Sequence, residues 1–518
     1  MKKLKLLALL AVALLIMAPA FADDFGFSSF GDESVSPSDS SSDDSSSFGS
    51  FDTDVFGGGE SSDDSNSLQI TGTAGLTSRV YLQDKNSVIA TGEDFVAGET
   101  YCTPSLKLDL SYSNTNSDLT GSILLTNDTV SSYPEDIINE ITYRAYVDNF
   151  VLEAGKTKIV WGRGDKIHVL DLINANDLSN FLIPDYIDRR IAEPEMDVTW
   201  NIPSEKNLSL QLIFTPGMSV DRLDTTGRWT PDAVALIKSN ITSYATKNML
   251  SAYTTAYDYY ISNGATVATA GAAATSAELL AAETYTDEDS YYANTHTLEY
   301  AQYGARLTGT IGTVDWGTEY YFGHYKTPSV KDLDSNIILD YDQLQVFGVD
   351  AETVKGAYSI RGELAYYLTE DIEGDDYSTH NNSLQWVAGF DRNLPWSNLN
   401  LNIQELGSYT LNYSKVQDNV SSVLPFDMDQ NAADCASNNK IIVKLSNTLM
   451  HETLKPSVSV MYGIEGVDLV IMPEVSYIVK DGFEVTANAN FVFSDDTTGE
   501  YAEYENNAEL QLKAEYSF

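Results

Sequence analysis

Much of the chain consists of short segments in which apolar and polar residues take alternate positions. Segment 106–112 shows the pattern, with apolar Leu106, Leu108, Leu110 and Tyr112 and polar Lys107, Asp109 and Ser111. The alternation recurs at 208–214, 398–404, 467–477 and 483–493. A period of two residues predicts β-strands that have one apolar face and one wet face. The polar positions are rich in Asn, Ser, Gln and Glu, which favours a water-filled lumen over a packed core.

Eighteen such segments can be counted along the chain. They begin near residues 68, 104, 119, 140, 150, 195, 207, 298, 313, 343, 356, 384, 398, 440, 456, 467, 482 and 504. Short connections, such as 148–149, alternate with long ones, such as 161–194, and only 463–466 breaks the rule. This alternation is typical of outer-membrane barrels. We therefore predict an all-β protein whose residues 66–518 form a transmembrane antiparallel β-barrel of 16–18 strands, 18 being the best count.

The last eleven residues alternate strictly. One face carries Ala508, Leu510, Leu512, Ala514, Tyr516 and Phe518, and the other Glu509, Gln511, Lys513, Glu515 and Ser517. The terminal aromatic residue resembles the signature by which bacterial outer-membrane barrels are recognised, so we expect Phe518 to engage the barrel-assembly machinery. An open sheet edge cannot exist in lipid. The final strand should therefore pair with the first strand, near residues 68–82.

The N-terminal residues predict export. Three lysines precede the apolar run 6–17, and the small residues Ala20 and Ala22 flank Phe21, so residues 1–22 have the features of a cleaved signal peptide. Residues 23–65 hold 12 acidic residues and no Lys or Arg. Such an acidic, Ser- and Gly-rich segment is expected to be a disordered periplasmic tail. Its Phe-Gly pairs are either docking points for a periplasmic partner or parts of a solvated linker.

Charge narrows the class of partner. Without the three lysines of the signal peptide, 27 basic residues face 76 acidic ones, a formal charge of −49. This excludes nucleic acid as a natural partner, because phosphate binding needs a basic surface. The 32 tyrosines suit aromatic girdles at the membrane interfaces. We expect the barrel to contact outer-membrane lipid and a lipopolysaccharide-like glycolipid.

Two cysteines, Cys102 and Cys435, fall in predicted loops at the same end of the barrel. Export permits a disulfide, but the sequence leaves their pairing open. No ligand spacing around them indicates a metal site, and no cofactor is expected. The five histidines are scattered, and no Gly-x-Ser-x-Gly motif is present, so we expect no enzymatic activity.

The connection 217–297 is exceptionally long and rich in alanine. Thr230 can cap a helix that begins with Pro231, and Gly264 can end it. Val234, Ile237, Ile241 and Tyr244 would share one helical face. A second helix is expected over residues 273–284. We predict a helical hairpin at the extracellular mouth, acting either as a lid or as an external cap.

The third long connection carries the candidate site. Over a fifth of the basic residues of the mature chain lie between residues 156 and 190, namely Lys156, Lys158, Arg163, Lys166, Arg189 and Arg190. Folded into the lumen, these cations would face carboxylates across the opening and create a transverse field. Arg361 and Glu363 share the polar face of one strand and would line the same lumen. The alternative is that the cations only brace the loop against the wall, and the two interpretations are compatible.

Short motifs in this half of the chain resemble a family of large bacterial outer-membrane β-barrel proteins that is an uncharacterised domain-of-unknown-function family. They are Ala154-Gly155-Lys156, Trp161-Gly162, the run from Leu172 to Asp177, Arg189-Arg190, Phe347 to Asp350, Arg361 to Tyr366 and Gly389 to Asp391. Ala175 stands where the family has proline. The resemblance implies a porin-like barrel that passes or delivers a poorly defined hydrophobic substrate, and it supplies no catalytic residues.

These observations predict an outer-membrane channel for passive or facilitated passage of small solutes. Two alternatives stay open. One is an envelope-tethering or adhesin-type barrel that acts through its long loop and acidic tail. The other is an uptake barrel for hydrophobic compounds, which would need an apolar pocket inside the lumen.

Overall fold

The computed structural model describes residues 68–89, 92–179, 186–332, 337–396, 398–417, 427–495 and 497–518. The predicted signal peptide (1–22) and acidic tail (23–65) lie outside the described residues. Within the described part, no helix is both long and apolar enough to cross a membrane.

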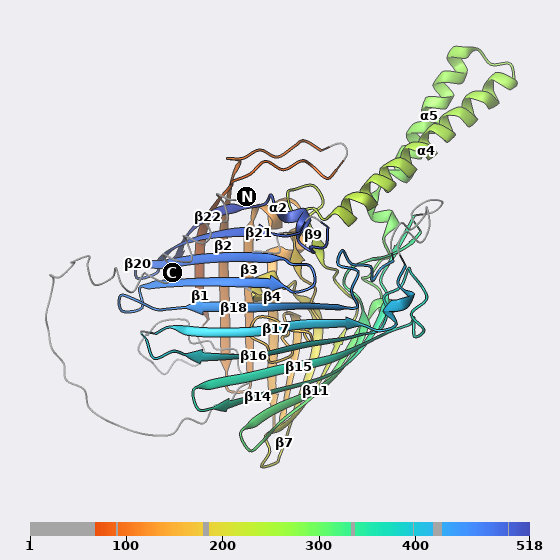
Figure 1. The fold of residues 1–518 in the computed structure, drawn as a ribbon. Helices are drawn as coiled ribbons and strands as arrows, with labels where there is room; N and C mark the ends of the chain where they lie inside the picture. The colour runs from red at the N-terminus through yellow and green to blue at the C-terminus, as the bar shows by residue number, and fades with distance from the viewer. Residues whose placement is uncertain are drawn as a thin grey trace, which may run out of the picture.

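A single 18-stranded sheet forms the body of the molecule (Figure 1). Its strands are β1 (Gln69–Tyr81), β2 (Thr100–Asn114), β3 (Ser117–Thr126), β4 (Ile138–Val147), β5 (Phe150–Thr157), β7 (Glu193–Ile202), β8 (Leu208–Thr215), β10 (Gln302–Ile311), β11 (Val314–His324), β14 (Gln343–Lys355), β15 (Tyr358–Thr369), β16 (Ser383–Asn393), β17 (Asn400–Thr410), β18 (Ser437–Ser446), β19 (Leu454–Gly463), β20 (Leu469–Lys480), β21 (Phe483–Phe493) and β22 (Glu509–Ser517). Each segment predicted from the alternation overlaps one of these strands, so the predicted count of 18 is confirmed.

The sheet closes on itself. β22 pairs antiparallel with β1 in a register that runs from Ser517 opposite Thr73 to Glu509 opposite Tyr81. The backbone of Phe518 extends this pairing, because it exchanges two hydrogen bonds of 2.9 Å with Gly72. No strand edge is left open to lipid, as a spanning sheet requires. The predicted closure between the first and last strands is confirmed.

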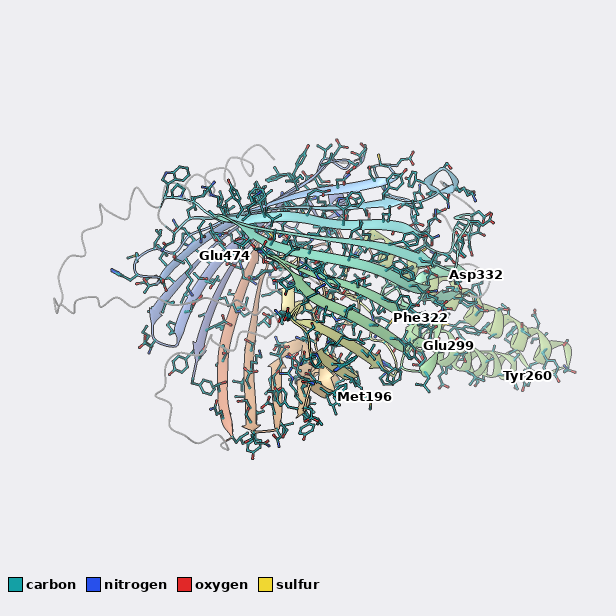
Figure 2. All side chains as sticks on the ribbon, turned by 90° about the horizontal axis from the view of Figure 1, so that it is seen from below. Met196, Tyr260, Glu299, Phe322, Asp332 and Glu474 are labelled. Atoms are coloured by element: carbon teal, nitrogen blue, oxygen red, sulfur yellow. The ribbon has the colours of Figure 1, made fainter. Side chains whose placement is uncertain are left out.

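The two faces of the wall differ as the alternation requires. On β7, Glu193 and Glu195 are buried inside the barrel, whereas Met196 and Val198 point outward and are exposed. Met196 is 61% exposed and its neighbour Glu195 only 4%, which assigns the apolar series to lipid and the acidic series to the lumen. Figure 2 shows Met196 on the outer surface of the barrel.

Short turns join the strands at one end of the barrel and longer connections at the other. We call these the turn end and the loop end; in barrels of this architecture they face the periplasm and the exterior respectively. The loop-end connections contain the small pairs β6 (Asp177–Leu178) with β9 (Arg222–Leu223) and β12 (Ser329–Asp332) with β13 (Ile338–Asp340). They also contain the helices α2 (Asn127–Ser131), α3 (Tyr186–Arg189), α4 (Asp232–Ser262) and α5 (Val267–Tyr285), and five short 3-10 turns.

The predicted helical insertion is present as α4 and α5, which pack antiparallel and project away from the barrel (Figure 1). The prediction that Thr230 caps the N-terminus of this first helix was wrong. Pro231 occupies the N-cap position of α4, and the Thr230 hydroxyl donates instead to the carbonyl of Gly227 at 2.9 Å. Thr230 therefore closes a turn before the helix and does not cap it. Tyr260 lies far out along the hairpin (Figure 2).

Only the base of the hairpin is anchored. Ile237 and Ile241 of α4 pack against Val330 and Leu339 of the β12–β13 pair. Just before α4, the Trp229 indole donates to the Tyr81 hydroxyl at 3.0 Å, and Trp229 packs with lumen-facing residues of β20 and β21. The base of the insertion therefore reaches into the mouth of the barrel, while most of its length stays outside.

Cys102 and Cys435 are not joined to each other. Cys102 lies opposite Ser78 on the outward series of β2, and Cys435 lies in the loop before β18. One cysteine therefore lies in the wall and the other in a loop, and both are free, which answers the question of pairing that the sequence left open.

Candidate functional site: the inward loop and the lumen

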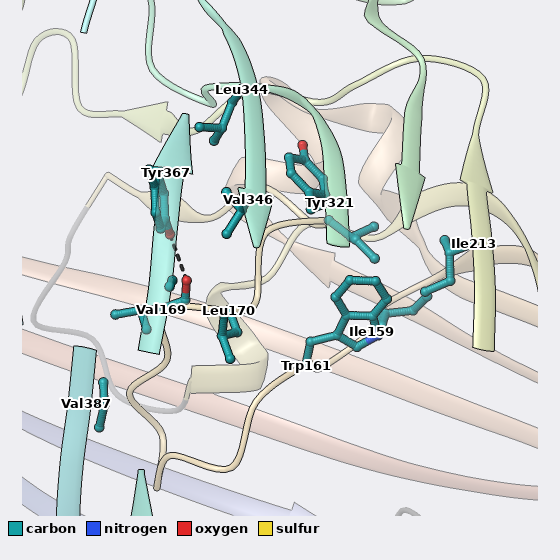
Figure 3. Packing of buried hydrophobic residues seen from close by; sticks show 12 residues of the cluster. Ile159, Trp161, Val169, Leu170, Ile213, Tyr321, Leu344, Val346, Tyr367 and Val387 are labelled. Carbon is teal, nitrogen blue, oxygen red and sulfur yellow. Dashed lines mark hydrogen bonds between the residues drawn. The ribbon is translucent and has the colours of Figure 1, made fainter. Parts of the chain in front are cut away.

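The connection between β5 and β7 (residues 158–192, with 180–185 outside the described part) folds into the lumen, and we call it the inward loop. Its apolar side chains Ile159, Trp161 and Leu170 are buried against wall residues that include Tyr321 and Val346 (Figure 3). Burial of these side chains removes apolar surface from the water of the lumen, which holds the loop against β8–β16. The predicted inward third loop is confirmed.

Trp161 fits because the wall carries a glycine beneath it. A Cβ atom at Gly304 would lie 2.5 Å from the Trp161 ring, so any larger residue would displace the indole. The indole N–H donates to the Gln211 side chain at 3.0 Å, which satisfies the one polar group of this side chain inside the cluster. The close approach of a tryptophan to the wall therefore depends on β10 having glycine at this position.

Glu363 of β15 is the main polar anchor of the inward loop. Its Oε1 accepts hydrogen bonds from the backbone N–H groups of Arg163 at 2.7 Å and Gly164 at 2.6 Å. Nδ1 of His168 lies 2.8 Å from the same oxygen, and Oε2 accepts from the backbone N–H of Val169 at 2.8 Å. A single wall carboxylate thus satisfies three backbone donors in a segment that has no sheet partner of its own.

Around this anchor, an arginine–carboxylate network links the loop to five strands, β10, β11, β14, β15 and β16. Arg163 pairs with Asp350 at 2.6 Å, and Arg306 bridges Asp350 at 3.0 Å and Glu319 at 3.1 Å. The network consists of Arg163, Arg306, Arg361, Glu319, Asp350, Glu352 and Asp391. The three arginines neutralise most of the charge of the four carboxylates inside the wall, so the network leaves little free field.

Inside the loop, Arg190 pairs with Asp171 at 2.8 Å, and both side chains are almost completely buried. Burial raises the pKa of the Asp171 carboxyl, and the charge of Arg190 opposes that shift. Asn174 completes the framework, because its side chain accepts from the N–H of Ile159 at 2.7 Å and donates to two carbonyl groups. The pair holds the two legs of the loop together.

The tip of the inward loop reaches β17. The backbone N–H of Asp165 donates to the Gln404 side chain at 3.0 Å, and the Asn402 amide donates to the Asp165 carboxylate at 2.6 Å. The loop therefore crosses from β5 to β17 and occupies the side of the lumen formed by β7–β16. The opposite side is formed by β18–β22 with β1 and β2, and we call it the far wall. In the described part of the chain, Trp229 covers this wall near the loop end, where it packs on β20 and β21.

The predicted site residues divide into three groups. Arg163, Arg361 and Glu363 meet in the lumen at the network and its anchor. Lys158 lies buried at the start of the loop, near Glu140 at 4.0 Å, and burial lowers its pKa. Lys166 and Arg189 also belong to the inward loop, at its tip and at the end of α3.

Two predictions of pore-facing charge were wrong. Lys156 lies opposite Ile141 and Pro194, which belong to the outward series, and its ammonium binds Asp136 at 3.1 Å at the loop-end rim. Arg190 faces a carboxylate of its own loop, and not one across the opening. Alternation along β5 explains the outward position of Lys156, because it lies an odd number of positions from Glu153 on the lumen face. Arg190 does not face the pore, because its ion pair with Asp171 lies inside the packed loop.

The exposure of charged pairs locates the open part of the lumen. On the far wall, Lys107 pairs with Asp109 at 3.6 Å and Lys513 with Glu515 at 2.8 Å, and the two lysine side chains are 44% and 35% exposed. In the network, Arg163 is only 10% exposed. Solvent therefore reaches the part of the far wall that carries these pairs, and the inward loop covers the other side of the lumen. Near the loop end the far wall is closed off from solvent, because the Arg79–Glu509 pair there has side chains only 18% and 0% exposed.

Several residues of this lumen were missed by the sequence interpretation. Arg306 and Glu319 face each other across β10 and β11, and their register pairing was not visible in the sequence. Lys107 and Asp109 were recognised only as polar positions of a strand. Their parity within the alternation was the available signal, since it already placed them on the wet face.

The fold and the inward loop define the chain as an outer-membrane β-barrel of the porin-like class, as the family resemblance implied for the architecture. No family model matches the chain, and no curated protein matches it. Among solved structures it is similar to Wzi, an outer-membrane protein involved in group 1 capsule assembly in Escherichia coli and described as a carbohydrate-binding β-barrel, at 11% identity over 86% of this chain and 84% of that chain, with a TM-score of 0.41.

Two further solved structures are also similar. OccK3 (OpdO) of Pseudomonas aeruginosa has 10% identity over 87% of this chain and 95% of that chain, with a TM-score of 0.43. The outer-membrane channel DcaP of Acinetobacter baumannii has 9% identity over 89% and 99%, with a TM-score of 0.39. At this level of identity the likenesses bear on architecture alone, and function has to come from this chain's own lumen.

Proposed function

We propose that this chain is an outer-membrane channel in which small hydrophilic solutes diffuse along the far wall, past an inward loop that narrows the lumen. Eighteen strands enclose an interior wider than their own side chains can fill. The inward loop occupies one side of that interior and is fixed there by Glu363. The remaining path runs beside β18–β22, β1 and β2.

The observation that carries this proposal is the contrast in exposure between the two sides of the lumen. Lys455 and Glu484 form a far-wall pair 3.5 Å apart, with side chains 44% and 34% exposed. Arg306 and Glu319 form a network pair at 3.1 Å, with side chains 13% and 2% exposed. Hydrated pairs of opposite sign line a path for polar solutes, because water and counter-ions are held there.

This lumen is unfavourable for the passage of apolar compounds. The large apolar cluster inside the barrel is filled by the inward loop itself, through Trp161, Leu170 and Ile173. A hydrophobic solute would have to displace these side chains or cross the hydrated charges of the far wall. Uptake of hydrophobic compounds is therefore the less supported alternative.

We also propose the location and partners that the barrel requires. The outward series of exposed apolar residues, such as Val198, Phe347 and Leu512, would contact the lipid of the outer membrane and its glycolipid. Phe518 is 58% exposed at the turn end, where assembly machinery can reach it. A periplasmic partner for the acidic tail concerns residues outside the described part.

Conductance in planar bilayers tests the proposed channel. We expect the purified full-length chain to give discrete conductance steps, and Glu363→Ala to give larger and noisier ones, because the inward loop loses its anchor. Glu515→Ala is the matched control, since it removes a lumen carboxylate from the far wall without touching the loop. A folded barrel that never conducts would refute the channel, and identical steps for Glu363→Ala and wild type would refute the role of the anchor.

The projecting hairpin favours binding as a second candidate function. Leu250, Tyr259 and Leu279 are each more than 60% exposed on α4 and α5, beyond the part that packs on the barrel. Exposed apolar side chains concentrated on one appendage are typical of a surface that contacts another molecule. A hairpin with this role could coexist with a channel, since its outer portion does not contribute to the lumen cluster.

A further inference from the structure

The far wall contains a recess close to the tip of the inward loop. Its cavity volume is about 330 Å³. Volumes of about 300–1,000 Å³ are usual for small-molecule sites, so the recess has room for a small solute. Strands β17–β20 and two turns at the turn end form it, and the residues that matter here are Asn400, Lys444, Asn447, Lys455, Ser457 and Glu474.

Only some of the charged side chains that line the recess have an ion-pair partner. Lys455 is paired with Glu484 at 3.5 Å. In the described part of the chain, neither Lys444 nor Glu474 has an ion-pair partner, although both line the recess. Other lumen lysines of the far wall are paired, for example Lys513 with Glu515. Within the described residues, Lys444 therefore presents to the recess a positive charge that is not engaged in an ion pair.

The position of Lys444 connects the recess to the narrowed part of the lumen. Lys444 lies opposite Asn402 on β17 and opposite Ser459 on β19, so it belongs to the lumen-facing series. The Asn402 amide contacts the Asp165 carboxylate at the tip of the inward loop, at 2.6 Å. A solute that passes the tip thus meets the recess next.

The rest of the lining suits hydroxyl groups. The Asn400 amide nitrogen donates to Asn393 at 2.9 Å, which leaves its oxygen to accept from a solute, and the hydroxyl of Ser457 can both donate and accept. Glu474 can only accept, which matches the O–H donors of a polyhydroxylated solute. An apolar ligand would offer no hydrogen bond to Ser457 or Glu474, which would weaken its binding by about a factor of ten for each group. The lining therefore selects against it.

We propose that this recess binds a small hydroxylated carboxylate of the sugar-acid class as it moves along the far wall. The inference rests on the proposed channel, because the solute has to reach the recess through the lumen. Lys444 holds the carboxylate through a charge-assisted hydrogen bond. The Asn400 side-chain oxygen, the Ser457 hydroxyl and Glu474 bind the hydroxyl groups. In a chain whose formal charge is −46, such a local cation lets an anion enter a lumen that would otherwise repel it.

Titration calorimetry of the folded full-length chain in detergent tests the recess without requiring conduction. The probes are D-glucuronate, D-glucose and acetate. We expect glucuronate to bind more tightly than either of the others, because only glucuronate offers both a carboxylate and hydroxyl groups. Lys444→Met should weaken glucuronate binding about tenfold or more, as the loss of a charge-assisted hydrogen bond does. Lys513→Met is the control, since it removes a lumen charge that is already paired with Glu515.

Conductance then separates the two proposals. In bilayers, glucuronate should interrupt the wild-type current, and the interruptions should shorten in Lys444→Met but not in Lys513→Met. Equal glucuronate binding by wild type and Lys444→Met, or equal binding of glucose and glucuronate, would overturn the sugar-acid site while leaving the channel intact. A protein that binds glucuronate through Lys444 but never conducts would instead refute the channel.

Discussion

Gly164 donates its backbone N–H to the Glu363 carboxylate at 2.6 Å, although 199 residues separate the two in the chain. The same carboxylate oxygen accepts from Arg163, and the other oxygen accepts from Val169. A loop that enters a lumen must find partners for its backbone polar groups, and here one side chain supplies several of them. The position of the loop is therefore determined at a single point on β15.

The first prediction concerns the glycine beside that anchor. Gly162 has φ +93°, and a Cβ atom there would lie 2.2 Å from Glu363 Oε1. Gly162→Ala should loosen the inward loop, because the methyl group and the carboxylate cannot share the space. Gly98→Ala is the matched control, since Gly98 has φ +85° and no heavy atom within 4 Å of its Cβ position.

Limited proteolysis of the folded barrel checks this prediction, with hydrogen exchange of residues 158–179 as the second readout. Both substitutions introduce a similar backbone strain of about 1–2 kcal/mol. Only Gly162→Ala should become more sensitive to cleavage in the inward loop. Equal protection of the loop in both variants would mean that the contact with Glu363 does not hold it.

The second prediction concerns the ion pair inside the loop. Arg190→Met leaves the buried Asp171 carboxylate without its partner, so stability should fall by about 3–5 kcal/mol. The double variant Arg190→Met/Asp171→Leu should recover most of that loss, because no buried charge remains. Urea unfolding of the detergent-solubilised barrel measures both. A single variant as stable as wild type would show that the pair does not brace the loop.

The third prediction concerns pH. Burial acts to raise the pKa of Asp342, but hydrogen bonds from His380, Lys331 and Ser329 outweigh it and hold that pKa well below its usual range. The stabilisation is present above the unfolded pKa of about 3.9 and is lost as pH falls through the lower folded value. The stability difference between wild type and Asp342→Asn should therefore be constant from pH 5 to about 4 and shrink in stronger acid.

Hydrogen exchange of residues 337–342 across this pH range measures the effect at the loop end. Asp332→Asn is the control, because it removes a nearby carboxylate from β12 that does not contact His380. A difference that already disappears at pH 5 would show that His380 and Lys331 do not depress the pKa of Asp342.

The fourth prediction tests whether the α4–α5 hairpin acts as a lid on the lumen or only as an external cap. Replacing residues 246–283 by a short Gly–Ser linker removes the outer hairpin but keeps Ile237, Ile241 and Tyr244 on the β12–β13 pair. Tyr244 and Tyr285 already lie 5.8 Å apart, measured between ring centroids, so the linker has little distance to span. Conductance should stay unchanged, because the part inside the mouth, including Trp229, is retained. A marked rise in conductance would identify the hairpin as a lid.

The barrel was predictable because each strand crosses the membrane once and must alternate between lipid and water. That rule located the starts of β5 and β14 to the residue and those of β2 and β22 within about five residues, and it implied the pairing of β1 with β22. It did not locate the partners of the inward loop. Glu363 has the same local pattern as any polar residue of a strand, and its contacts come from a segment about 200 residues earlier. The error at Lys156 came from grouping cations by proximity along the chain without applying the parity of the strand.

The central claim is that solutes follow the far wall and that the charges of the network are neutralised. Reversal potential in a salt gradient tests it most directly, with the double variant Lys107→Met/Lys513→Met compared with Arg163→Met. Loss of the two exposed lysines should shift the channel toward cations, whereas Arg163→Met should leave the potential close to that of wild type. A large shift for Arg163→Met, with no shift for the far-wall variant, would contradict the account and place the path at the inward loop.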